Sequence, residues 1–217
     1  MIRNLCFHGV GKLKKEREPG EARYWVSEGL FHAVLDEVAS YPHVRLSFDD
    51  GNKSDILVAL PALRERGLGA AFFPLAGRLQ DPDSLDDFDL KELRSAGMEI
   101  GSHGWAHVPW RRLSNEQARR EFVEAREVLT RASAGPIQKV ALPLGRYDRA
   151  VLRRLKEVGY VTVYTSDRMP AQAHSWLQAR YSITADDTID SVRAMLTRRP
   201  GRGEARNLAA SLVKRLR

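Results

Sequence analysis

Two short segments of the chain carry the residue types that bind a metal ion and move a proton. Asp49 and Asp50 are adjacent carboxylates followed directly by Gly51, and His103 and His107 lie four positions apart further along the chain. One carboxylate and two imidazoles form a ligand set that leaves positions open for water and substrate, as catalytic zinc requires. The second carboxylate stands beside that set as a base. This combination predicts metal-assisted hydrolysis.

Each half of the pattern also has a plainer interpretation. An Asp-Asp-Gly sequence is common in surface turns and helix caps, and taken alone that interpretation is favoured. Gly101, Gly104 and Pro109 disfavour a helix around the histidine pair, so a loop must bring both imidazoles to one ion. A lone histidine pair is more often surface or core than metal-bound. With a carboxylate at the end of another strand, the metal-binding interpretation is favoured.

Short apolar runs alternate with amphipathic segments along the chain. This alternation, with short connections, predicts right-handed parallel β-α-β units. About seven predicted strands fit a closed or nearly closed β/α barrel, with an open doubly wound sheet as the alternative. The predicted strands are 2–7, 44–48, 68–73, 98–101, 137–142, 160–164 and 180–183, and the predicted helices are 27–39, 54–66, 85–96, 114–130, 148–158, 186–196 and 204–216.

One regularity favours the barrel over the open sheet. Polar residues follow the predicted strands at their C-terminal ends, namely His8, Asp49, Asp50, His103 and residues 144–147. In a barrel these strand ends converge on one mouth, so we expect residues distant in sequence to share one site. The intervening segments 12–21 and 79–87 are predicted loops.

Composition excludes several classes of protein. A chain of 217 residues that is 43% hydrophobic and 29% charged is typical of a single globular domain. Cys6 is the only cysteine, which excludes an intrachain disulfide. No apolar run approaches the ~20 residues that span a bilayer, and the first apolar run is followed by charge rather than by the core of a secretion signal. We therefore expect a cytoplasmic protein.

The net charge of +7 is concentrated at the C-terminus. We expect a domain over 1–197 and a basic tail over 198–217 that forms an amphipathic helix. Leu208, Leu212 and Leu216 recur among the basic residues, as in a helix at a membrane interface, and the alternative is a helix packed on the barrel. The first interpretation implies peripheral contact at the inner face of the membrane. No nucleic-acid recognition motif accompanies the charge, so we expect no nucleic-acid partner.

Together the motifs resemble those of the NodB-homology polysaccharide deacetylases, also known as carbohydrate esterase family 4. Residues 47–51, Ser-Phe-Asp-Asp-Gly, resemble the first motif, and residues 103–107, after Gly-Ser, resemble the second. Residues 141–148, Ala-Leu-Pro-Leu-Gly-Arg-Tyr-Asp, are similar to a variant third motif. Residues 7–10, Phe-His-Gly-Val, resemble the opening of the exopolysaccharide branch. The resemblance runs from about residue 2 to 197 and implies a distorted (β/α)7-type barrel in a single domain.

The resemblance also implies roles for individual residues. Asp49 is the expected general base, and Asp50, His103 and His107 are the expected metal ligands. The implied ion is Zn²⁺, although other divalent transition metals suit this ligand set. The ion polarises an amide carbonyl and lowers the pKa of a water molecule, while Asp49 takes the proton.

Residues around the motifs are expected to contact the substrate. A backbone N–H near Leu144 or Gly145 is expected to stabilise the oxyanion. Trp105, Trp110 and Tyr147 flank the motifs and suit stacking on a sugar ring, although aromatic residues beside an active site also simply pack.

Three departures from the family pattern affect this assignment. The third-motif arginine that orients the base is replaced by Ala141, and Arg180 on a later strand is one source of the missing charge. The Asp-Trp of the fourth motif is not evident, although Ser166-Asp167 lies near its place. The late histidine that serves as general acid is absent. His8 on the first strand, a neighbour of the last strand in a barrel, is the expected replacement, with a buried, hydrogen-bonded histidine as the alternative.

The expected function is removal of N-acetyl or other small acyl groups from amino sugars of a polysaccharide or glycan precursor. The expected partner is an N-acetylated glycan or a lipid-linked sugar, and the sequence indicates no oligomeric state. One alternative is a catalytically degenerate protein that binds glycans or acts as a scaffold, suggested by the missing arginine and histidine. The other is a deformylase or deacylase of a lipid-linked sugar.

Overall fold

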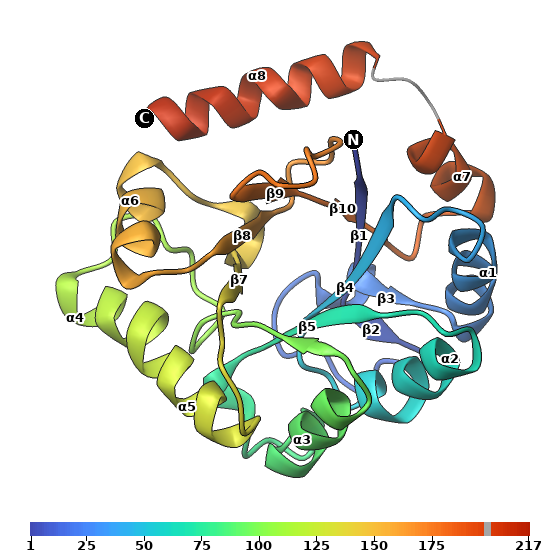
Figure 1. The fold of residues 1–217 in the computed structure, drawn as a ribbon, viewed down its shortest axis with the longest axis horizontal. Helices are drawn as coiled ribbons and strands as arrows, with labels where there is room; N and C mark the ends of the chain where they lie inside the picture. Colours follow the sequence, from blue (N-terminus) through green and yellow to red (C-terminus); the bar gives the residue numbers. More distant parts are fainter. Residues whose placement is uncertain (198–200) are drawn as a thin grey trace.

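Parallel strands surrounded by helices form the fold in the computed structural model, which describes residues 1–197 and 201–217 (Figure 1). The larger sheet has the order β10-β1-β4-β5-β6 and the smaller one the order β7-β8-β9. All pairings within both sheets are parallel. The strands are β1 (Arg3–Phe7), β4 (Val44–Asp50), β5 (Ala70–Pro74), β6 (Glu99–Ile100), β7 (Lys139–Ala141), β8 (Thr162–Thr165), β9 (Leu177–Ala179) and β10 (Tyr181–Ser182), with β2 (Gly9–Val10) and β3 (Trp25–Val26) as a separate parallel pair.

Two connections bring the sheets together into a distorted barrel. On one side, Ser102, just after β6, forms a parallel bridge with Val140 of β7. On the other side, only Arg180 separates β9, which pairs with β8, from β10, which pairs with β1. This arrangement confirms the predicted barrel-type α/β fold in one domain, although in the described residues the ring consists of two hydrogen-bonded sheets rather than one continuous closed sheet, with β2 and β3 as a further pair.

Phenylalanines at matching positions of neighbouring strands form the layer between the sheet and the helices. Phe7 pairs in register with Phe48, and Phe48 with Phe72, and the ring centroids lie 5.5 and 4.7 Å apart. Phe31 of α1 (Glu28–Val38) packs on Phe7 at 5.1 Å. All four rings are fully buried. Because side chains alternate across a strand, Asp49 faces the opposite side, into the barrel.

Local capping explains where several helices begin and end. Ser114 and Gln117 form the capping box that opens α4 (Asn115–Arg119), and Asp148 caps α6 (Arg149–Val158) by accepting a hydrogen bond from the Val151 N–H. Gly159 ends α6 with φ 86°. The remaining helices are α2 (Leu60–Glu65), α3 (Asp87–Ser95), α5 (Ala125–Ala132), α7 (Ile189–Thr197) and α8 (Arg202–Leu216).

Three predicted elements differ in detail from the structure. The helix predicted over 54–66 begins with a π-helical turn, Asp55–Ala59, and Pro61 falls in the first turn of α2, where its missing N–H is tolerated. The helix predicted over 114–130 contains a second π-helical turn, Arg120–Glu124, between α4 and α5. The strand predicted over 180–183 corresponds to β10, but β9 directly before it was not predicted, and the chain changes its pairing partner at Arg180 between the two.

The C-terminal helix α8 lies across the outside of the ring, next to α6 (Figure 1). Arg198 and Arg199, which belong to the predicted basic tail, lie outside the described residues. Across the described ranges, no helix is both long enough and apolar enough to cross a bilayer.

Candidate active site

The two carboxylates at the end of β4 leave the strand in different directions. Asp49 continues the alternation of the strand, while Asp50 adopts a left-handed backbone conformation with φ 73°. Gly51 follows with φ 70°, and a Cβ atom there would lie 2.7 Å from the Cβ atom of Pro74 on the neighbouring strand. The sequence Asp-Asp-Gly therefore makes a tight turn that requires glycine at its third position and directs the two carboxylates apart.

Arg180 holds the carboxylate of Asp49 with two hydrogen bonds. Its Nη1 donates to Oδ1 at 2.7 Å and its Nη2 donates to Oδ2 at 2.6 Å, and both side chains are buried. Burial raises the pKa of Asp49, but the charges of Arg180 and then His103 outweigh it and hold the pKa well below its usual value. A bidentate pair fixes the orientation of a carboxylate as well as its charge. Arg180 thus supplies to Asp49 the positive charge that is missing at position 141, where this chain has alanine in place of the family's arginine.

Replacing Arg180 with glutamine should lower the free energy of unfolding by about 3–5 kcal/mol, because the change leaves a buried carboxylate without its partner. Urea unfolding followed by circular dichroism measures this difference. The matched control is Arg193→Gln, which removes an exposed arginine that pairs with Glu37 at 2.8 Å. The control should change stability little, because solvent screens that pair. Equal effects of the two substitutions would contradict the structural role of Arg180.

Asp50, His103 and His107 form a group that suits a metal ion. One donor atom from each residue lies within 4.8 Å of the others. The Nε2 atoms of both histidines lie 3.6 Å from Asp50 Oδ1, which is too far for a hydrogen bond. Asp50 Oδ1 and His103 Nε2 are buried without a hydrogen-bond partner. Buried polar atoms are rarely left unpaired, and an ion between these atoms satisfies both, so the residues fit a divalent metal.

The outer nitrogen of each histidine is held by an acceptor, which directs the other nitrogen to the metal position. His103 Nδ1 lies 2.9 Å from the carbonyl oxygen of Ala141, and His107 Nδ1 lies 2.5 Å from Glu18 Oε2. Since a carbonyl oxygen only accepts, His103 carries its proton on Nδ1 and presents the Nε2 lone pair. Burial lowers the pKa of His103 to about 4. His103 is therefore neutral at pH 7, which is the form that binds metals.

Glu18 belongs to the site, although it is part of no recognisable sequence motif. It lies on the predicted loop 12–21, 89 residues from His107 in sequence, and it also pairs with Arg78. The short 3-10 helix that follows, Glu21–Tyr24, brings Glu21 and Tyr24 to the cavity wall. A loop without periodic pattern therefore covers one side of the site and positions a metal-ligand candidate.

His8 and the metal group face one cavity. The cavity has a volume of about 220 Å³, and Asp49 and Arg180 also line it. The His8 ring lies 4.7 Å from that of Tyr24, and its Nδ1 is buried without a hydrogen-bond partner. Burial lowers the pKa of His8, although Asp50 and Asp49 oppose this effect. A neutral, incompletely bonded imidazole beside the two carboxylates is suited to exchanging a proton.

Leu144 and Gly145 line the same cavity and lie in a short 3-10 turn, Pro143–Gly145, rather than in a strand. Both have left-handed backbones, with φ 56° and 61°, and the Leu144 side chain is half-exposed. A Cβ atom at residue 145 would lie 2.3 Å from Ser166 Oγ. This close approach of the backbone requires glycine and puts main-chain groups on the cavity wall. Ser166, expected near the fourth motif, is also on this wall.

Three aromatic residues that were expected to stack on a sugar lie away from this wall. Tyr147 is 1% exposed, and its hydroxyl donates to Asp167 Oδ2 at 2.6 Å. Trp110 is 1% exposed and packs in the core. Trp105 is partly buried, with the Arg120 guanidinium 4.6 Å from its ring. Their bulk is used in packing, and Tyr24 is the aromatic residue on the cavity wall.

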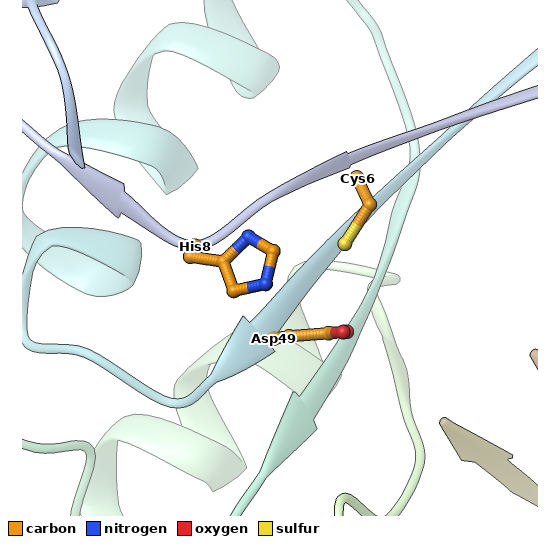
Figure 2. Close-up of side chains that lie close together, drawn as sticks. All are labelled: Cys6, His8 and Asp49. Carbon is orange, nitrogen blue, oxygen red and sulfur yellow. The ribbon is translucent and has the colours of Figure 1, made fainter. Parts of the chain in front are cut away.

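A second close group, Cys6, His8 and Asp49, is visible in Figure 2. Burial raises the pKa of the Cys6 thiol well above its usual value, so the sulfur keeps its proton. Metal binding requires the thiolate, and both oxygens of Asp49 already accept hydrogen bonds from Arg180. This group therefore suits proton transfer near Asp49 rather than a second ion.

The parallel strands and the acids and histidines gathered at their C-terminal ends define a NodB-type β/α barrel. A family model of polysaccharide deacetylases matches residues 37–163, which is more than half of the chain and includes Asp49, Asp50 and both histidines of the metal group. The chain belongs to the polysaccharide deacetylase family. None of the curated proteins matches it in sequence.

Solved structures of deacetylases share this fold. The Streptococcus pyogenes deacetylase PplD in complex with acetate is 19% identical and has a TM-score of 0.77, covering 91% of this chain and 98% of that chain. A de-N-acetylase from Aggregatibacter actinomycetemcomitans is 16% identical with a TM-score of 0.73, covering 90% and 99% of the two chains. IcaB from Ammonifex degensii is 20% identical with a TM-score of 0.72, covering 89% and 96%. At these identities the similarity establishes the fold.

Proposed function

We propose that this chain is a metal-dependent hydrolase that removes N-acetyl groups from amino sugars of a polysaccharide or a glycan precursor. Family membership supports deacetylation of glycans. The observation that carries the metal dependence is the meeting of Asp50, His103 and His107 within 4.8 Å, with two buried donor atoms left unpaired. Zn²⁺ is the ion that we propose, because neutral imidazoles and one carboxylate in an open site suit it.

The metal group, Asp49 and Arg180 each have a defined part in this proposal. A divalent ion held by Asp50, His103 and His107 supplies a Lewis acid for the acetamide carbonyl and lowers the pKa of water. Asp49 accepts the proton of the attacking water, and Arg180 keeps its carboxylate ionised and oriented. A main-chain N–H near Leu144 is the donor that we propose for the developing oxyanion, because the Gly145 N–H donates to the Leu142 carbonyl oxygen at 3.4 Å.

The leaving amine needs a proton, and His8 is the residue that we propose donates it. His8 lines the cavity together with Asp49, and its lowered pKa makes its protonated form a stronger acid than an ordinary imidazolium. The products are acetate and a free amine, so the proton taken up by Asp49 and the proton given by His8 balance over one turnover. The cavity thus holds a base and an acid beside a single metal position.

Acetate release from oligomers of N-acetylated hexosamine tests this function. The zinc-loaded protein should release one acetate for each new free amine, and dialysis against a chelator should lower the rate at least about a hundredfold, with recovery when Zn²⁺ is returned. Formate release from an N-formyl sugar in place of acetate would instead identify a deformylase. Glycan binding without any acyl release would identify the degenerate, non-catalytic alternative.

A further inference from the structure

The C-terminal helix α8 docks on the barrel by polar side chains. Lys214 Nζ donates to Asp167 Oδ1 at 2.7 Å, and the fully buried Ser211 donates to Asp167 Oδ2 at 3.0 Å. Two turns before Lys214, Asn207 donates to a main-chain carbonyl oxygen at 2.9 Å. These residues recur every three or four positions, so they form one stripe of the helix. The stripe that faces the protein is therefore polar.

The other side of α8 is apolar and exposed. Leu208, Leu212, Val213 and Leu216 are 46%, 44%, 61% and 77% exposed. A helix on the surface of a soluble domain normally turns its apolar face toward the core. In α8 this orientation is inverted, and a cluster of exposed apolar side chains marks an interaction surface.

The charge of α8 indicates what covers this surface. Arg206, Arg215 and Arg217 are exposed on or directly after the helix, and Glu204 is its one acidic residue. Basic side chains beside an apolar stripe are the combination that binds anionic lipid headgroups and the acyl region below them. A second copy of the chain would instead bring like charges together. We propose that the apolar face of α8 docks the protein on the surface of an anionic bilayer.

The same contacts connect α8 to the cavity. Lys214 also donates to the carbonyl oxygen of Gly145 at 3.2 Å, and Gly145 lines the cavity beside the half-exposed Leu144. Docking through α8 therefore keeps the cavity close to the lipid surface. Resting on the function proposed above, this arrangement favours a glycan attached to a lipid over a free glycan as substrate.

Sedimentation of the full chain with vesicles tests the docking surface without any substrate. Binding to phosphatidylcholine vesicles that contain phosphatidylglycerol should exceed binding to pure phosphatidylcholine at least about tenfold and should weaken as salt rises. Leu212→Ser/Leu216→Ser should lower the partition coefficient about tenfold or more. The matched control is Phe88→Ser, which removes an 81% exposed ring from α3, on the far side of the ring of helices (Figure 1), and it should bind like the wild type.

Arg215→Glu/Arg217→Glu provides a second variant that leaves the apolar face intact, and it should also lose about tenfold in binding to anionic vesicles. An unchanged melting temperature shows that each variant folds. Absence of vesicle binding by the wild type, or equal binding by the wild type and the leucine variant, would overturn the proposal. A dimer in gel filtration that the leucine variant lacks would assign the face to a second copy and also overturn it. Vesicle binding is measured without substrate and acetate release without vesicles. Failure of the docking proposal therefore leaves the proposed deacetylase function untouched, and the reverse also holds.

Discussion

Replacing Asp49 with asparagine should lower the rate of acetate release about 10²- to 10⁴-fold, because an amide cannot accept the proton of the attacking water. Asparagine keeps the shape of the side chain next to Arg180, and Asp50, His103 and His107 are unchanged. The variant should therefore still bind one metal ion. The measurements are the kcat for acetate release and the metal content of the same preparation.

Asp50→Asn is the matched control, since it changes the adjacent carboxylate in the same way. This variant should lose metal as well as activity, because Asp50 contributes a donor atom to the metal group. The two variants thus separate the base from the ligand. Near wild-type activity in Asp49→Asn, or loss of metal from it, would show that Asp49 is not the base. A melting temperature for each variant excludes unfolding as the cause.

Zinc binding should disappear in the double variant His103→Ala/His107→Ala, because one carboxylate alone holds a divalent transition metal weakly. The wild-type protein should retain about one zinc per chain after desalting, and zinc at 100 times its Kd should raise the free energy of unfolding by about 2.7 kcal/mol. Elemental analysis and thermal unfolding with and without zinc measure both effects.

The control for this experiment removes two histidines that lie outside the metal group, His32 and His174. His32→Ala/His174→Ala should bind zinc like the wild type. Zinc retained by the His103→Ala/His107→Ala variant would place the metal elsewhere. A wild-type protein that takes up no zinc would remove the basis for hydrolysis and favour the glycan-binding alternative.

Much of the fold could be predicted because the elements follow simple periodic rules. The predicted helices 27–39, 148–158 and 204–216 each lie within a few residues of α1, α6 and α8, since caps and apolar faces mark their ends. The two π-helical turns, Asp55–Ala59 and Arg120–Glu124, could not be predicted, because no capping residue or change of apolar face sets them apart from the neighbouring α-helix. The division into β9 and β10 at Arg180 could not be predicted either, because it depends on pairing with two different strands, of which β1 is far away in sequence.

The candidate site was predictable only where it lies at strand ends. Asp49, Asp50 and His103 follow or end strands, so barrel geometry brings them together. Glu18 lies on a loop, where no periodicity tells which way a side chain points. The same limit applies to Tyr147 and Trp105, whose types suit sugar stacking but whose irregular segments turn them into the protein.

The segment that joins the two sheets also has a consequence for the order of events during synthesis. Asp49 and Arg180 are 131 residues apart, and Arg180 lies where β9 passes into β10. A growing chain therefore contains Asp49, Asp50 and both histidines of the metal group well before Arg180, which pairs with Asp49, has been added. Partly synthesised chains should be inert toward acyl groups. Pairing of the last strand with the first is therefore the step that brings Arg180 next to Asp49 and completes this part of the site.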